Sequence, residues 1–300
     1  MLCQIDFTAQ GTKILKYFLA IIFSLCSSVA YADWGDEILK HKLQMQQKTY
    51  ELILAQYEAY KTDNVPKIAA DIIQLIPIHD SNESLISLKL YNTNLRIRMM
   101  DDPKDPFQGP DFSAGFDESA KMRIGVYRAL EKTLTNLDSI ASSFGYKPGQ
   151  ISIRVFEGLR LISTQKTLFE NKLKQIKDEN PKFSDEQAYE ETSKWVSPVQ
   201  NNIPVQSTGA AVFIRLYDEQ AQTYLDMGQF GIFWSDNKTA PTFSADITAA
   251  QINNRLFLLI AATDAGFINY PYAYWHYSIG DRYAAYWRRP SPLQAIYGQV

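Results

Sequence analysis

The stretch GFINYPYAYWHYSIGDRY, residues 266–283, carries most of the structural information in this chain. It is dense in aromatic side chains and punctuated by glycine and proline. The pattern predicts two short aromatic strands, Tyr274–Ser278 and Tyr283–Trp287, after a helix over Asp246–Ala265. Aromatic rings on such strands more often build a core than a binding platform for sugar rings or peptide, so we expect most of them to be buried.

The rest of the chain mixes helical and strand patterns without a regular β-α-β rhythm. Apolar residues at helical spacing predict further helices: Asp36–Tyr60, Asp117–Phe144 and Ser163–Lys177. A capping box at Ser184–Gln187 starts another short helix. Strand patterns cover three segments: Ser84–Tyr91, Gln150–Phe156 and Ala210–Tyr217. This order favours an α+β fold, with a small mixed or antiparallel sheet flanked by helices, over a doubly wound sheet.

Composition excludes several functional classes. The 300 residues are 46% hydrophobic and 21% charged, so the chain can bury a full core. A formal charge of −3 with mixed signs leaves no basic footprint for nucleic acid. The sequence contains no glycine-rich phosphate-binding pattern.

The first 32 residues have the pattern of a secretory signal peptide. Lys13 and Lys16 precede an apolar run, Tyr17–Leu25, and Ala30-Tyr31-Ala32 provides a small-x-small cleavage pattern. An uncleaved anchor is the alternative. Both cysteines of the chain fall in this segment, so the mature protein would rely on packing rather than disulfides. We therefore expect a periplasmic or secreted protein with no membrane span once the signal is removed.

Four ordered landmarks carry a resemblance to a known family. They are, in chain order, Glu157–Arg160, Gly209–Phe213, Leu225–Gly228 and the terminal run Trp275–Tyr283. From about residue 80 to 289 the chain resembles the D-alanyl-D-alanine dipeptidases, zinc enzymes of the vancomycin-resistance type. The resemblance implies a single dipeptidase-like domain over 79–300, preceded by a helical N-terminal extension, 33–78, that has no counterpart in it.

The resemblance also implies an active site, but this sequence departs from it. In the family a His, an Asp and a later His bind zinc, a Glu serves as base, and an Arg stabilises the oxyanion. The matching ligand positions here are Gln206, Phe213 and His276, and the base position is Ala273. Only His276 of the metal-and-base set and the arginine, Arg160, are retained.

These substitutions predict a protein that no longer cuts a dipeptide. One imidazole holds zinc weakly, because affinity requires several convergent ligands. We therefore expect no cofactor, and an exported, catalytically inactive homologue that binds a peptide or cell-wall fragment. Arg160, Trp275 and Tyr277 are the candidate binding residues. Arg160 could equally form a structural ion pair, and His276 could be a hydrogen-bonded core histidine.

Two alternatives stay open at this point. The protein could be an active zinc dipeptidase hydrolysing D-Ala-D-Ala in peptidoglycan metabolism, with ligands such as His41 or His79 supplied from elsewhere in the fold. It could instead be a structural or interaction protein that uses the helix 36–60 to bind a partner. The sequence does not predict the oligomeric state.

Overall fold

The computed structural model describes residues 33–100, 116–230 and 238–300. The predicted signal peptide, residues 1–32, lies outside the described residues. Asp33–Val300 forms one unit, which contains both of the predicted segments 33–78 and 79–300. The architecture is α+β, as the sequence predicts. Within the described part of the chain, no helix combines the length and the apolar character needed to cross a bilayer.

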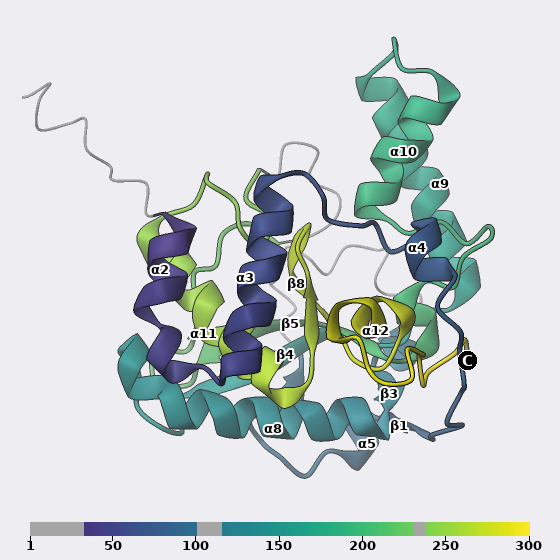
Figure 1. Ribbon diagram of the computed structural model, residues 1–300. Helices are drawn as coiled ribbons and strands as arrows, with labels where there is room; N and C mark the ends of the chain where they lie inside the picture. The colour runs from purple at the N-terminus through teal and green to yellow at the C-terminus, as the bar shows by residue number, and fades with distance from the viewer. Residues whose placement is uncertain (1–32, 101–115, 231–237) are drawn as a thin grey trace, which may run out of the picture. The chain divides into compact units, whose positions relative to one another are not determined.

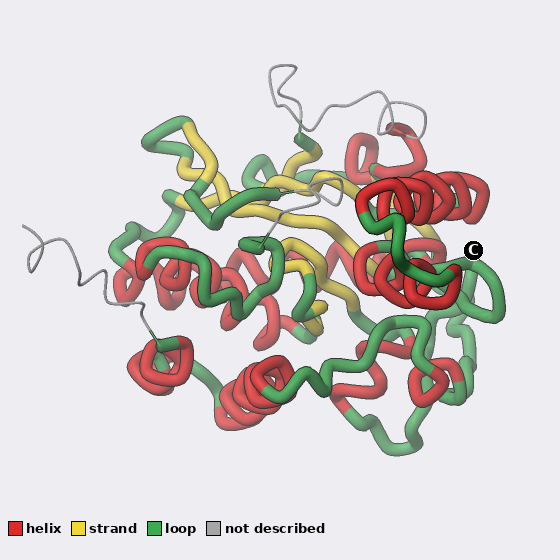
Figure 2. Tube along the Cα trace, turned by 90° about the horizontal axis from the view of Figure 1, so that it is seen from above, coloured by secondary structure: helices red, strands yellow, loops and turns green. Residues whose placement is uncertain are grey.

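A mixed sheet forms the centre of this unit (Figure 2). Its strands lie in the order β2 (Ile97–Met99), β4 (Ile151–Glu157), β5 (Ala211–Asp218), β8 (Ala273–Ser278) and β7 (Ile268–Tyr270), with β6 (Thr223–Tyr224) pairing to β5. Only the β2–β4 pair is parallel; the other pairs are antiparallel. Strand β4 is buried along its whole length although Ile151–Val155 alternates apolar and polar residues. Its buried Arg154 is accommodated by hydrogen bonds to Ser152 and Glu219.

Helices pack around the sheet in two groups (Figure 1). In the first group, α11 (Ala249–Ala265) contacts α8 (Ile124–Ile140) as well as α2 (Trp34–Lys40) and α3 (Gln47–Lys61). Because α11 is covered on several sides, buried apolar residues occupy most of its circumference. In the second group, α9 (Ile162–Glu179) and α10 (Asp185–Trp195) form a helical hairpin, and α12 (Arg282–Arg288) packs on the short α4 (Asp71–Gln74).

The predicted helix 36–60 is not continuous. It is divided into α2 and α3 by a 3-10 turn, Lys42–Gln44. His41 ends α2, and its buried ring stacks on Phe144 with the ring centroids 4.2 Å apart. The break therefore places a buried aromatic contact inside the range predicted as one continuous helix.

The predicted strand 84–91 is correct only in its first half. Strand β1 (Leu85–Ser87) pairs with β3 (Lys121–Arg123), and the chain then turns into α5 (Leu88–Tyr91). Leu88 is buried, whereas Leu90 is 90% exposed, so the apparent alternation does not mark one buried face. The partner strand β3 and the short α7 (Phe116–Ser119) also take the start of the predicted helix 117–144.

The second predicted aromatic strand, Tyr283–Trp287, is instead the helix α12. Asp281 caps this helix, because its Oδ1 accepts a hydrogen bond of 2.9 Å from the amide of Ala284. Tyr283 and Ala284 are buried in one cluster with Tyr270 and Ile268. The cap and this packing override the strand preference of the aromatic residues.

Candidate functional site

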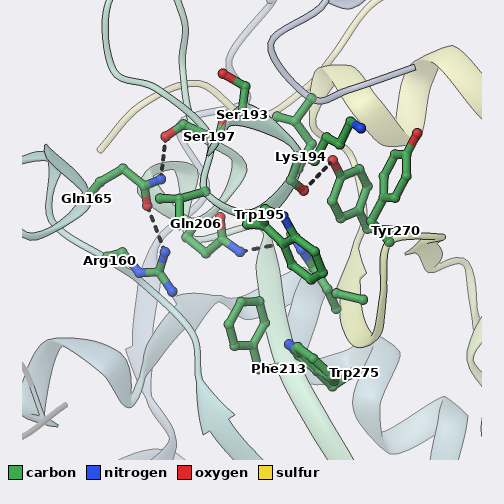
Figure 3. A pocket seen from close by; sticks show the side chains of 15 residues that line it. Arg160, Gln165, Ser193, Lys194, Trp195, Ser197, Gln206, Phe213, Tyr270 and Trp275 are labelled. Atoms are coloured by element: carbon green, nitrogen blue, oxygen red, sulfur yellow. Dashed lines mark hydrogen bonds between the residues drawn. The ribbon is translucent and has the colours of Figure 1, made fainter. Parts of the chain in front are cut away.

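The residues at the matched family positions converge on one pocket (Figure 3). Arg160 follows β4, Phe213 lies in β5, and Ala273 and His276 lie in β8. Gln206 comes from the 3-10 turn Val205–Thr208, which leads into β5. The pocket is narrow: about 30 Å³ of it is accessible to the centre of a water molecule, within about 510 Å³ of atom-free space that includes open solvent. It is also lined by Ile68, Gln165, Ser193, Lys194, Trp195, Val196, Ser197, Tyr270, Tyr272 and Trp275.

Strand register places the central residues in one row. Phe213 is the Cα partner of Glu157 on one side and of His276 on the other. Residues directly opposite each other on paired strands bring their side chains within contact distance. The row Glu157–Phe213–His276 is therefore set by the backbone pairing of β4, β5 and β8.

Gln206 and His276 contact each other directly. The amide Nε2 of Gln206 lies 3.2 Å from Nε2 of His276. Burial, together with the nearby charge of Arg160, lowers the pKa of His276 to about 3. The imidazole is therefore neutral at physiological pH, and its unprotonated nitrogen can accept a hydrogen bond from the Gln206 amide.

The turn that carries Gln206 is held at both ends. The backbone carbonyl of Gln206 accepts a hydrogen bond of 3.1 Å from the amide of Arg160. Gly209 ends the turn at φ 68°, in the left-handed region, and a Cβ there would come within 2.7 Å of Leu85 Cδ2. A residue other than glycine would thus disturb both the turn and its packing.

Phe213 and Ala273 give the pocket an apolar character where the resemblance implies charged side chains. The Phe213 ring centroid lies 5.1 Å from that of His276, at an interplanar angle of 61°. The guanidinium carbon of Arg160 lies 5.6 Å from the centroid of the same ring. Neither Phe213 nor Ala273 has a side-chain atom that could ligate a metal or accept a proton.

The described side chains do not fit a catalytic zinc ion. Such an ion needs three protein ligands and an open position for water. Here one imidazole is hydrogen-bonded to an amide and flanked by a benzyl ring. Across residues 33–100, 116–230 and 238–300 there is no group of three His, Cys, Asp or Glu that could hold a metal. His41 is buried against Phe144 and His79 is exposed, and neither lines the pocket.

Arg160 takes part in a buried ion pair. Its Nε donates to Glu157 Oε1 at 2.7 Å, and its second terminal nitrogen donates to the other oxygen of the same carboxylate. The remaining terminal nitrogen donates to Gln165 Oε1 at 2.8 Å, and Gln165 in turn donates to the carbonyl of Ser197 at 2.6 Å. Arg160 therefore forms an ion pair with Glu157, and its charge is balanced within the protein.

The two aromatic residues predicted to bind a ligand, Trp275 and Tyr277, lie in different places in the structure. Trp275 lines the pocket. Tyr277 is buried elsewhere, with its ring centroid 6.3 Å from that of Phe267, and does not line the pocket. Trp275 is therefore placed where it could contact a ligand in the pocket, whereas Tyr277 is not.

Several lining residues were missed by the sequence analysis. Tyr270 and Tyr272 belong to the aromatic segment already singled out, so that density was the available signal. Ile68 comes from the connection between α3 and α4, in the extension that has no family counterpart. That connection is held to the hairpin by Lys67, which bonds the side chain and the carbonyl of Glu190.

Comparison with known proteins gives a partial match. Residues 157–294 match the family model described as D-ala-D-ala dipeptidase. Two solved structures are similar at 16% sequence identity and a TM-score of 0.32 each. One is the LdcB LD-carboxypeptidase, in a study of peptidoglycan recognition, covering 59% of this chain and 67% of that chain. The other is VanYB in complex with D-Alanine-D-Alanine, covering 56% and 78%. No curated protein matches the chain.

Proposed function

Since residues 157–294 belong to the D-alanyl-D-alanine dipeptidase family, we propose that this chain is a member that binds a cell-wall ligand without hydrolysing it. The ligand would occupy the pocket around His276. The observation that carries the proposal is the set of groups around this imidazole: the amide of Gln206 and the ring of Phe213 beside it, and the methyl group of Ala273 in the same pocket.

Each substitution removes a separate chemical step. Without three ligands there is no metal to lower the pKa of a bound water or to polarise the scissile carbonyl. Without a carboxylate at Ala273 there is no group to take the proton, and losing general acid–base help alone costs roughly 10²–10⁴ in rate. A frame that retains His276 and Arg160 but replaces the other three residues supports binding rather than turnover.

The proposed location is outside the cytoplasm. Support comes from the signal-peptide pattern of residues 1–32 and from the absence of cysteine after them. A ligand derived from the cell wall would be accessible there.

The alternative role for residues 36–60 as a partner-binding helix has little support. The buried apolar residues of α2 and α3 include Trp34, Ile38 and Ile53, and both helices pack on α11. Only Leu39 and Leu43, which are 58% and 95% exposed, remain as exposed large apolar side chains that a partner could reach on this segment.

The proposal is tested by comparing the native protein with the triple variant Gln206→His, Phe213→Asp, Ala273→Glu. We expect the native protein to purify without stoichiometric zinc and to leave D-Ala-D-Ala intact. The triple variant should gain zinc and measurable hydrolysis, because it regains the family's donor set around His276. Circular dichroism of both proteins checks that they are folded.

A matched control is the double variant Gln206→His, Phe213→Asp, which restores ligands but not the base. It should bind zinc and remain at least about 10²-fold slower than the triple variant. Native protein with one zinc per chain and efficient hydrolysis of D-Ala-D-Ala would refute the proposed function.

A further inference from the structure

The positive charges that line the pocket are already balanced. Two cationic side chains line it, Arg160 and Lys194. Arg160 is paired with Glu157 and Gln165, as described above, and Lys194 Nζ lies 3.0 Å from a carboxylate oxygen of Glu191. His276 is neutral. The described pocket wall therefore presents no cation in need of an anionic partner, which a ligand with a free carboxylate would require.

One buried donor in the pocket has no partner. The indole Nε1 of Trp275 has no hydrogen bond among the described residues, although Trp275 is only 1% exposed. Figure 3 shows this nitrogen on the side of the ring that faces Phe213. An indole N–H can only donate, and a buried donor left unpaired is costly. An acceptor oxygen that reached this nitrogen would therefore meet an open donor.

The rest of the wall suits a neutral amide. Gln206 brings an amide, which can both donate and accept, to the same pocket. Trp195, Tyr270 and Tyr272 contribute aromatic rings, which pack against apolar or ring-shaped groups while keeping a polar edge. Donor, amide and rings together complement a group that carries a carbonyl oxygen, an N–H and an apolar neighbour, but no charge.

We propose that this pocket binds an uncharged secondary amide whose carbonyl oxygen accepts a hydrogen bond from the indole N–H of Trp275. This inference rests on the proposed function, since it names the ligand class of the same pocket. Two sources share this chemistry: the acetamido group of an N-acetylated sugar, and a peptide bond in a chain whose ends are not free. A free dipeptide, with an ammonium and a carboxylate, is disfavoured because neither charge finds an open partner.

The test is a calorimetric titration of the mature protein with three probes: N-acetylglucosamine, N-acetyl-D-alanyl-D-alanine amide and free D-Ala-D-Ala. We expect at least one neutral probe to bind with a Kd at least tenfold lower than that of the free dipeptide. The better neutral probe identifies the source, sugar or peptide.

Trp275→Phe removes the N–H and keeps an aromatic ring, so it should raise the Kd of the neutral probe at least tenfold. Trp287→Phe is the matched control, because Trp287 also has a buried indole nitrogen and lies outside the pocket. It should leave the affinity unchanged. If Trp275→Phe does not fold, the indole proton resonance of Trp275 in the native protein replaces it, and should shift downfield when the neutral probe binds.

Three results would overturn the inference: tightest binding by free D-Ala-D-Ala, equal affinity in both tryptophan variants, or no binding of either neutral probe at 10 mM, roughly the weak limit for a small ligand. Tight binding of the free dipeptide without hydrolysis would leave the proposed function standing. Zinc-dependent hydrolysis would remove the proposed function itself.

Discussion

At the scale of single residues, the two cationic side chains of the pocket, Arg160 and Lys194, are paired with carboxylates inside the protein. The Glu157–Arg160 pair shows this best, since both side chains are buried and the guanidinium is further bonded to Gln165. Removing one partner of such a pair leaves a buried charge and typically costs about 3–5 kcal/mol. From sequence alone, Arg160 could equally bind a ligand carboxylate or form an ion pair. Glu157 lies only three residues away, but the local backbone that turns its carboxylate onto the guanidinium is known only from the structure.

His276 should make stability depend on pH. Its folded-state pKa is about 3, below the usual 6.5. Between these pH values the imidazole is protonated in the unfolded chain but neutral in the native protein. The stability that His276 contributes is therefore complete above about pH 6.5 and is lost as pH falls toward 3. Between pH 7 and pH 5 the loss should be about 2 kcal/mol in the free energy of unfolding.

Urea unfolding of the native protein and of His276→Gln at pH 7, 6 and 5 measures this contribution. The variant should be less stable at pH 7 but should lose about 2 kcal/mol less on going to pH 5. Parallel pH profiles for the two proteins would mean that the native imidazole takes up its proton as readily as the unfolded chain does.

At the scale of elements, the strands and helices with strong local signals were predictable. Strand β4, strand β5 and the capped helix α10 lie within a few residues of their predicted ranges. The capping box of α10 is complete, with Ser184 and Gln187 bonding each other's backbone. Errors arose where a tertiary contact decides the local structure, as where β1 needs β3 as its partner before it can be a strand.

A buried cap contributes to holding α12 in a helix. Asp281 is 1% exposed, and its Oδ1 bonds the amide of Ala284. We expect Asp281→Ala to lower the free energy of unfolding by about 0.5–2 kcal/mol through loss of the cap. Asp281→Asn should cost less, because an amide oxygen still caps the helix and carries no charge.

The pH dependence of these variants provides a second readout. Burial raises the pKa of Asp281, so its contribution is complete at low pH and declines as pH rises through the folded-state value. Asp281→Asn should therefore compare more favourably with the native protein at pH 7 than at pH 4, in urea unfolding. If Asp281→Ala were as stable as Asp281→Asn, the cap would not be what holds α12 in a helix.

At the scale of the whole molecule, the family resemblance predicted the converging residues but not what surrounds them. Gln206, Phe213, Ala273 and His276 do meet in one pocket, as their matched positions imply. The wall that Ile68 provides comes from the N-terminal extension, for which the resemblance offered no template. A pocket assembled from distant segments depends on packing, which local patterns do not report.

The N-terminal extension should be part of the folding unit rather than an appendage. Its helices cover α11, and two buried hydrogen bonds join it to distant segments: Trp34 Nε1 to the carbonyl of Ser244 at 2.9 Å, and Gln56 Nε2 to the carbonyl of Asn269 at 2.8 Å. Deleting residues 33–62 would uncover the apolar surface of α11. We expect the shortened protein to lose cooperative thermal unfolding or to aggregate, as measured by calorimetry and light scattering.

Point substitutions separate packing from mere chain shortening. Ile53 is 0% exposed, so Ile53→Ala should cost about 2–5 kcal/mol in the free energy of unfolding, through lost burial and a new cavity. Leu43 is 95% exposed, so Leu43→Ala should stay within about 0.5 kcal/mol of the native protein. Equal effects of the two substitutions, or an unchanged melting transition after the deletion, would show that the extension folds apart from the domain. In that case the wall at Ile68 could not be a fixed part of the pocket, because the connection that carries it would lose its anchor on α11.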